Sequence, residues 1–302
     1  MLKFSKVHVS LVSTLGLMVA TQVGLGLYQG FQSREAGTPD QMVQRGSAQA
    51  VGLTGPQDKH FQVGSVKELD HVFDHSGYDL KNASHTREVP RLYLAKLPKD
   101  MTKKKKSSNG TFIQVLLPHV LKVNEKILKD RGRLVDLKEQ LKTRHLRHAE
   151  KMWLVKLASD YRCKSTKIDA LLMHVDIVPP SLALAQATIE SGGGRSSAAL
   201  SKNSTFGHMT RNNKVMRFES LQQNVEAYVH NLNRHSAYAS FRKVRADLRA
   251  KNQPLCGVRL AACLEKYSIR KAAYTRDVQN LINNRGLRKY DTMTLKQVHL
   301  KP

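Results

Sequence analysis

The segment IVPPSLALAQATIESGGGRSSAALSKNSTFGHM, from Ile177 to Met209, has the clearest structural pattern in this 302-residue chain. Pro180 suits the first turn of a helix, where a missing backbone N–H costs nothing. The glycines Gly192 to Gly194 then end the helix. Between them, the predicted buried face consists of Leu182, Ala185 and Ile189. The pattern therefore predicts a buried helix with Glu190 at its C-terminal end.

A carboxylate at this end of a helix has an unfavourable environment for its charge. The negative pole of the helix dipole and the unpaired carbonyls disfavour the ionised form, and partial burial would disfavour it further. We therefore expect a raised pKa for Glu190, as a general acid that protonates a glycosidic oxygen near neutral pH requires. The small residues after it would let a sugar polymer approach the backbone. The alternative is a solvated side chain without a catalytic role.

Apolar residues recur at helical spacing from Phe112 almost to the end of the chain. Pro118 should kink or restart the first of these helices near its first turns. The other predicted helices cover residues 134–157 and 168–174 and three stripes that begin near residues 218, 238 and 274. No alternating strand of useful length is found. We therefore predict a mainly α fold.

Residues 1–30 have the pattern of a targeting segment. Lys3 and Lys6 precede an uncharged, mostly apolar run from Val9 to Tyr28, which is typical of a signal peptide or a membrane anchor. Small residues for a cleavage site are poorly placed, and the run is nearly long enough to span a bilayer, so an anchor is slightly favoured. In both cases we expect export to the periplasm or cell envelope.

The segment from residue 31 to residue 88 is polar and shows no sustained period, which predicts a linker or a loosely ordered arm. An extended segment, VPRLYLAKLP, follows it. The lysine run Lys103 to Lys106 is interpreted as a solvated loop. The predicted organisation is a targeting segment at 1–30, an arm at 31–88 and a domain at 89–302, with a helical lead-in at 89–175 and a catalytic core at 176–302.

The positive charge is concentrated after residue 90. Residues 91–302 hold 42 Lys and Arg against 16 Asp and Glu, a difference of +26 that equals the net charge of the whole chain. Such a surface binds polyanions, namely nucleic acid, acidic lipid headgroups or an anionic cell wall. Export argues against nucleic acid, as does the lack of a zinc-finger spacing, a basic zipper or an aromatic RNA-binding motif. We expect a monomer without a nucleic-acid partner.

Three cysteines in an exported chain allow one disulfide. Cys256 and Cys263 would lie about 10 Å apart along a helix, too far to bridge each other, so Cys163 would be the partner of one of them. Three free, buried thiols are an equally supported alternative. The histidines form no HExxH or other zinc motif, and Ser and His show no triad spacing. We therefore predict neither a metal nor a cofactor.

The segment around Glu190 resembles the glucosaminidase domain of glycoside hydrolase family 73. The pattern of that family is a proline, a small and apolar helix, the motif A-x-x-E-S-G-W-G and a loop that ends in N-x-x-F-G. The corresponding elements here are Pro180, Gln186 to Glu190, Ser191 to Gly194, and Asn203 to Gly207.

The resemblance is closer to one branch of this family, the Bax proteins, and covers most of the chain from about Val89. The blocks that carry it are VPRLYLAKLP, FIQVLLPHVLKVNEKILKDRGRL, VDIVPPSLALAQATIES, FESLQQNVEAYVHNLNRHSAYASFRKVRADLR and KYSIRKAAYTRDVQNLI. It implies a lysozyme-like, α-rich fold and N-acetylglucosaminidase action on peptidoglycan, with Glu190 as the acid. It also implies that Tyr267 and Tyr274 lie near the substrate, although core packing is the alternative for both, and more so for Tyr274. The other implied substrate-binding residues are Ser191, Gly194, Asn203, Phe206 and Gly207.

Two departures from the family pattern bear on activity. The Trp of the S-G-W-G turn is Gly193 here, which removes an aromatic surface for a sugar. The stretch GHMTRNNKVMR after Phe206 is short and holds no acid, whereas relatives have a longer lobe there that can supply a second carboxylate. Glu219 is then one candidate for the second catalytic group. The other, which we favour, is the substrate's own 2-acetamido group, oriented by Tyr267. The alternative function is a weak or inactive wall-binding relative.

Overall fold

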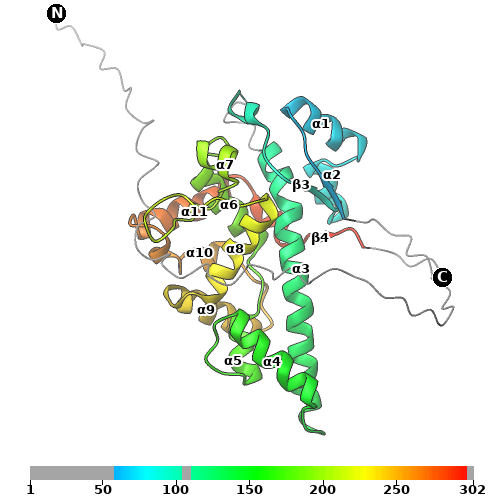
Figure 1. Ribbon diagram of the computed structural model, residues 1–302, viewed down its shortest axis with the longest axis vertical. Helices are drawn as coiled ribbons and strands as arrows, with labels where there is room; N and C mark the ends of the chain where they lie inside the picture. The colour runs from blue at the N-terminus through cyan, green and yellow to red at the C-terminus, as the bar shows by residue number, and fades with distance from the viewer. Residues whose placement is uncertain (1–57, 104–109, 298–302) are drawn as a thin grey trace, which may run out of the picture.

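The computed structural model describes residues 58–103 and 110–297, and these residues form the mainly helical fold that the sequence predicts. The longest helix, α3 (Gly110–Gln140), runs the length of the molecule, with α1 and α2 on one flank and α6 to α11 on the other (Figure 1). The α-helices are α1 Val66–His75, α2 Leu80–Thr86, α3, α4 His148–Asp160, α5 Ile168–His174, α6 Pro180–Ser191, α7 Ser197–Lys202, α8 Leu221–Arg234, α9 Ala239–Ala250, α10 Gly257–Ala261 and α11 Ala272–Asn284. The 3-10 helices are η1 Lys99–Lys103, η3 Ser236–Tyr238, η4 Glu265–Tyr267 and η5 Leu287–Thr292.

The strands of the described chain are very short and pair in parallel over long sequence distances. They are β1 Lys59–Phe61, β2 Glu88–Val89, β3 Leu92–Leu94 and β4 Thr294–Leu295. β1 pairs with β3, and β2 pairs with β4 near the C-terminal end of the described residues. A single antiparallel bridge between Met209 and Val215 lies in the stretch that the sequence marked as short.

Helix α6 lies in the core and packs against α3, α10, α11 and η5. Pro180 occupies its first turn, as predicted. The Ser181 backbone N–H and hydroxyl both donate to the carboxylate of Asp291, at 2.8 Å each, so a distant acid caps the helix N-terminus. Gly192 ends the helix in the left-handed conformation, with φ 60°. Glu190 is therefore held in the last turn of a buried helix.

The prediction of a loosely ordered arm is wrong for residues 58–88. Ser65 caps α1, whose Leu69 and Phe73 are buried in the core, and Asp79 caps α2. Helix α1 has a local signal that the prediction missed, because Val66, Leu69 and Phe73 recur at helical spacing behind the Ser65 cap. Strands β1 and β2 have no such signal, and pairing with distant strands stabilises them. The described part of this segment thus belongs to the same fold as the residues after 88.

Helix α3 continues through Pro118 without the predicted restart. A proline leaves the carbonyl four residues earlier without its helical partner. That carbonyl belongs to Gln114, and it accepts a hydrogen bond of 3.0 Å from the hydroxyl of Tyr78. The Gln114 amide donates in return to the Tyr78 carbonyl. The predicted charged helix at 134–157 is also corrected, because α3 ends at Gln140 and α4 begins at His148.

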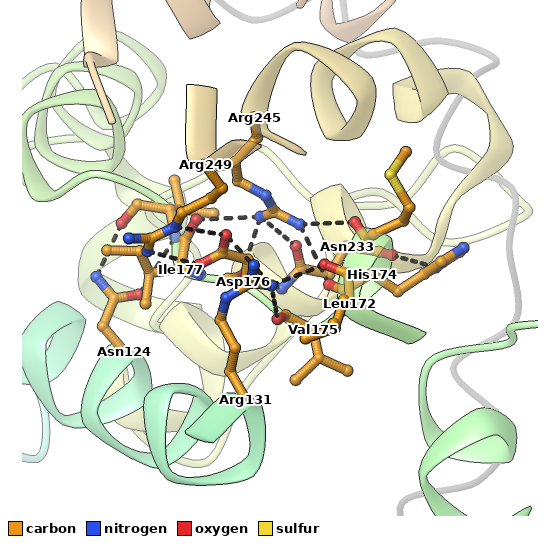
Figure 2. Close-up of polar contacts among 12 residues, drawn as sticks. Asn124, Arg131, Leu172, His174, Val175, Asp176, Ile177, Asn233, Arg245 and Arg249 are labelled. Atoms are coloured by element: carbon orange, nitrogen blue, oxygen red, sulfur yellow. Dashed lines mark hydrogen bonds and ion pairs between the residues drawn. The ribbon is translucent and has the colours of Figure 1, made fainter. Parts of the chain in front are cut away.

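A buried ionic network joins the segment before α6 to α3, α8 and α9 (Figure 2). Asp176, 1% exposed, accepts two hydrogen bonds from Arg249, at 2.9 and 3.0 Å, and forms an ion pair with Arg131 at 3.5 Å. Arg245, also 1% exposed, donates to the carbonyls of Asp176 and Ile177 and to the Asn233 side chain. Burial raises the pKa of Asp176, but the arginines outweigh it and hold that pKa below its usual range. The network therefore keeps Asp176 ionised in the core.

Several predictions concern residues outside the described ranges. The targeting segment at 1–30 lies there, as do Lys104 to Lys106, while Lys103 ends η1. Within 58–103 and 110–297, no helix is long and apolar enough to cross a membrane. Cys163, Cys256 and Cys263 are free, half-buried thiols, and no disulfide joins them in the described structure.

Candidate active site

Glu190 lies half-buried in the last turn of α6, facing the loop that follows α7. Gly207, in that loop, has φ +67°, and a Cβ added to it would lie 2.7 Å from Oε2 of Glu190. The backbone at Gly207 thus approaches the carboxyl group more closely than any side chain would allow. The two motif elements of the sequence, the turn after Glu190 and the loop ending in Phe206–Gly207, therefore lie side by side.

The pKa of Glu190 is raised to about 7. Burial is the largest cause, and a hydrogen bond from Tyr274 and the positive charge of Arg270 oppose it. A carboxyl group with this pKa is protonated in a large fraction of molecules near neutral pH, as general acid catalysis requires. The direction of the shift is the one expected from the sequence, and burial is its cause.

Tyrosine side chains from several elements surround Glu190. Tyr274 of α11 is 2% exposed and stacks on Tyr267 of η4, with ring centroids 5.6 Å apart. Tyr228 of α8 and Tyr238 of η3 lie close enough for the Glu190 charge to raise their pKa, although burial is the larger cause. Tyr274 alone among these lowers the pKa of Glu190 through hydrogen bonding. Tyr274 thus has a buried core position, as the alternative predicted, and also influences the candidate acid.

Tyr267 acts on the loop and not on the acid. Its hydroxyl donates a hydrogen bond of 2.8 Å to the carbonyl of Phe206. Phe206 is 1% exposed and stacks on Tyr228 with ring centroids 3.9 Å apart. Together these contacts hold Gly207 against Glu190. The Tyr267 hydroxyl proton is thereby committed to a backbone carbonyl.

Three of the predicted substrate-binding residues instead lie in the interior. The Ser191 hydroxyl donates to the Ala187 carbonyl and accepts from the Gly194 N–H, at 2.6 and 2.8 Å. Asn203 is 3% exposed and donates to the carbonyls of Phe218 and Glu219. Gly194 is buried against Phe112, where a Cβ would come within 2.5 Å of the ring. These residues shape the turn and the loop beside Glu190, and their side chains face protein.

Glu219 is exposed and directly precedes the Ser220 cap of α8. Its backbone N–H donates to the Gln223 side chain, and its carbonyl accepts from Asn203. Among the residues that the structure describes, no carboxylate contributes to the shifted pKa of Glu190. The pKa of Glu190 is therefore set by burial, Tyr274 and Arg270, without a contribution from a described carboxylate.

The sequence did not assign a role to Gln186. Gln186 is fully buried, donates to the Tyr274 hydroxyl at 2.9 Å and accepts from the Tyr228 hydroxyl at 2.7 Å. A signal was available, because an amide four residues before Glu190 shares its helix face, on a helix whose other buried residues are mostly small or apolar. Tyr228 and Tyr238 belong to apolar helical stripes of the sequence, and such stripes predict core positions and no role in a site.

The contact between Gly207 and Glu190 leads to a prediction for Gly207→Ala. The new methyl group should push the Glu190 carboxyl group aside, and a displacement of about 1 Å can cost about a hundredfold in rate. The positive φ should also cost about 1–2 kcal/mol of stability. Gly286→Ala is the matched control, since Gly286 has φ +59° and nothing within 4 Å of its added Cβ. We expect equal stability losses and a rate loss only at position 207, measured by thermal unfolding and by release of soluble fragments from cell walls. Equal rates in the two variants would contradict the prediction.

Comparisons with known proteins agree with this geometry. Residues 169–287, which include Glu190 and its tyrosines, match the Glucosaminidase family model, described as mannosyl-glycoprotein endo-beta-N-acetylglucosaminidase. Protein bax of Escherichia coli (strain K12) is 30% identical over 210 residues, which make up 64% of this chain and 73% of that protein. No solved structure matches the chain significantly.

Proposed function

Because this chain belongs to the glucosaminidase family, in the branch of the Bax proteins, we propose that it cleaves the glycan strands of peptidoglycan as an N-acetylglucosaminidase with Glu190 as the general acid. The observation that carries the proposal is the half-buried Glu190 carboxyl group, with a pKa of about 7 and a glycine as its nearest loop neighbour. The protonated form can donate to a glycosidic oxygen as the bond breaks. The absence of a side chain at Gly207 gives a bulky sugar access to that proton.

We favour the substrate's 2-acetamido group as the second catalytic function. A retaining pair of carboxylates lies about 5 Å apart and an inverting pair about 6.5–9.5 Å apart. Glu219 is exposed at the start of α8, and its charge does not contribute to the pKa of Glu190. In a substrate-assisted reaction the acetamido oxygen attacks the anomeric carbon while Glu190 protonates the leaving oxygen. The role first expected for Tyr267 changes, because its hydroxyl bonds to Phe206 and supports the loop.

The proposal is tested by the products formed from purified cell walls. Cleavage as an N-acetylglucosaminidase leaves N-acetylglucosamine at the new reducing end, whereas a muramidase leaves N-acetylmuramic acid and a lytic transglycosylase leaves an anhydro sugar. Borohydride reduction of the digest, followed by mass spectrometry and sugar analysis, distinguishes the three. We expect reduced glucosamine as the new end, and reduced muramic acid as the main product would contradict the bond assignment.

A non-catalytic wall-binding protein is the second candidate function. It is favoured by Gly193, which is buried where the family pattern has Trp, and by the short acid-free stretch 207–217. Zymography on gels that contain cell wall separates the two candidates. A cleared band supports the hydrolase, whereas binding to cell walls without clearing supports the binding protein.

The positive charge and the N-terminal segment fit the same proposal. We propose that the chain acts outside the cytoplasm, in the cell envelope, and that the apolar run from Val9 to Tyr28 serves export or anchoring. The excess of Lys and Arg over residues 91–302 would hold the protein on an anionic wall. Such attraction is screened by salt over about 8 Å at physiological ionic strength.

A further inference from the structure

A chain of buried hydrogen bonds joins Tyr228, Gln186 and Tyr274, and Tyr274 influences the carboxyl group of Glu190. Tyr228 donates to Oε1 of Gln186 at 2.7 Å, and Nε2 of Gln186 donates to the Tyr274 oxygen at 2.9 Å. Tyr274 in turn lies close enough to Glu190 for its hydrogen bonding to lower the pKa of the Glu190 carboxyl group. Three helices contribute to this chain, namely α8, α6 and α11. Gln186, Tyr228 and Tyr274 are each at most 2% exposed, so water does not compete for these bonds.

The orientation of the Gln186 amide sets the direction of each bond. An amide oxygen only accepts and an amide NH₂ only donates, whereas a tyrosine hydroxyl can do both. With its oxygen toward Tyr228 and its NH₂ toward Tyr274, Gln186 occupies an acceptor site on the Tyr274 oxygen and leaves the Tyr274 hydrogen for Glu190. With the amide turned over, Tyr274 would donate to Gln186 and Glu190 would lose its donor.

We propose that Gln186 and Tyr228 are positioning residues that fix the direction of the Tyr274 hydroxyl toward Glu190. The proposal rests on the proposed role of Glu190 as the general acid. When one carboxyl oxygen of Glu190 accepts the Tyr274 hydrogen, the catalytic proton is carried by the other oxygen. The hydrogen-bond chain thus selects which oxygen presents the proton to the substrate.

The composition of α6 supports a specific role for this amide. Burying a polar group costs free energy unless it is hydrogen-bonded, and Leu or Ala occupies most neighbouring positions of α6. Gln186 makes both of its hydrogen bonds to tyrosine side chains. It also lies four residues before Glu190, on the same helix face.

The other ionisable groups near Glu190 have different contacts. Tyr267 donates to the Phe206 carbonyl, and the pKa of Tyr238 is raised overall by burial, although Asn231 lowers it. Arg270, between η4 and α11, pairs with Asp277 at 2.6 Å and acts on Glu190 through its charge. Tyr274 is therefore the group through which Gln186 can act on the acid.

Loss of the chain should raise the pKa of Glu190, because the Tyr274 hydrogen bond favours the ionised carboxylate. A general acid works while protonated, so activity present at low pH is lost as pH rises through this pKa. A higher pKa moves that loss to higher pH. A hydrogen bond to a charged group corresponds to about one to two pH units.

The test measures the Glu190 pKa directly and does not depend on activity. The carboxyl group is titrated by difference infrared spectroscopy or carbon NMR and assigned with Glu190→Gln. The variants are Tyr274→Phe, Gln186→Met and Gln186→Glu, the last of which accepts the Tyr274 hydrogen. We expect upward shifts of about one to two pH units in all three. Tyr228→Phe removes a single hydroxyl and should give a smaller shift in the same direction, so it serves if the Gln186 variants do not fold.

Asn124→Leu is the matched control. Asn124 is a buried amide that donates to the Val178 carbonyl at 2.8 Å, away from Glu190. This variant should lose stability without a shift in the Glu190 pKa. An unchanged Glu190 pKa in folded Gln186 and Tyr228 variants would overturn the proposal and leave Gln186 a core residue. Shifted pKa values in a protein that does not hydrolyse peptidoglycan would support the hydrogen-bond chain and contradict the proposed function.

Discussion

Glu190→Gln should lower peptidoglycan hydrolysis by about two to four orders of magnitude, because an amide cannot donate the proton that the leaving oxygen requires. The side chain keeps its size and can still accept from Tyr274, so the protein should fold as before. The rate of release of soluble fragments from purified cell walls measures the effect, and circular dichroism checks the fold. The wild-type rate should also fall as the pH rises above about 7, the pKa of Glu190.

Glu219→Gln makes the same chemical change in an exposed side chain. If the substrate's acetamido group is the second catalytic function, this variant should keep most of its activity. A loss comparable with that of Glu190→Gln would identify Glu219 as the second carboxylate and contradict substrate assistance. Near wild-type hydrolysis by Glu190→Gln would remove the general acid assignment.

Asp176→Asn should be the most destabilising of these changes. The substitution removes the negative charge of Asp176, which compensates the positive charges of Arg131 and Arg249. Arg245 lies beside this carboxylate in the core (Figure 2). Removing one partner of a buried ionic network costs about 3–5 kcal/mol of the free energy of unfolding. For a domain of this size, each kcal/mol corresponds to about 2–4 °C in the melting temperature, so a decrease of roughly 6–20 °C is expected.

The control for this change is Asp169→Asn. Asp169 pairs with Lys138 at 2.6 Å, but its side chain is 75% exposed, and surface ion pairs contribute about 0–1 kcal/mol to the free energy of unfolding. Equal melting temperatures for the two variants would show that the network adds little to stability.

The contribution of Asp176 to stability should depend on pH. Because the folded-state pKa of Asp176 is depressed, the carboxylate stabilises the folded protein above the usual aspartate pKa. This stabilisation is lost as the pH falls through the depressed value.

The helices and the position of Glu190 follow from local patterns. Pro180 and Gly192 mark the two ends of α6, and the apolar stripes predict α5, α8, α9 and α11 closely, because each signal lies within a few turns of chain. A raised pKa for Glu190 was expected from the helix end and partial burial, and in the structure burial raises it. Local signals failed where short elements depend on distant partners, as in β1 and β2.

Tertiary contacts supply the features that no local pattern contains. Pro118 leaves the Gln114 carbonyl without its helical partner. Tyr78, 36 residues before Gln114, donates to that carbonyl, and α3 remains continuous. Gln186 meets Tyr228 and Tyr274 across separations of 42 and 88 residues. A residue type shows which hydrogen bonds a side chain can make, but packing alone brings a particular donor to a particular acceptor. The candidate acid could therefore be found in the sequence, whereas the groups that set its pKa and orientation required the folded structure.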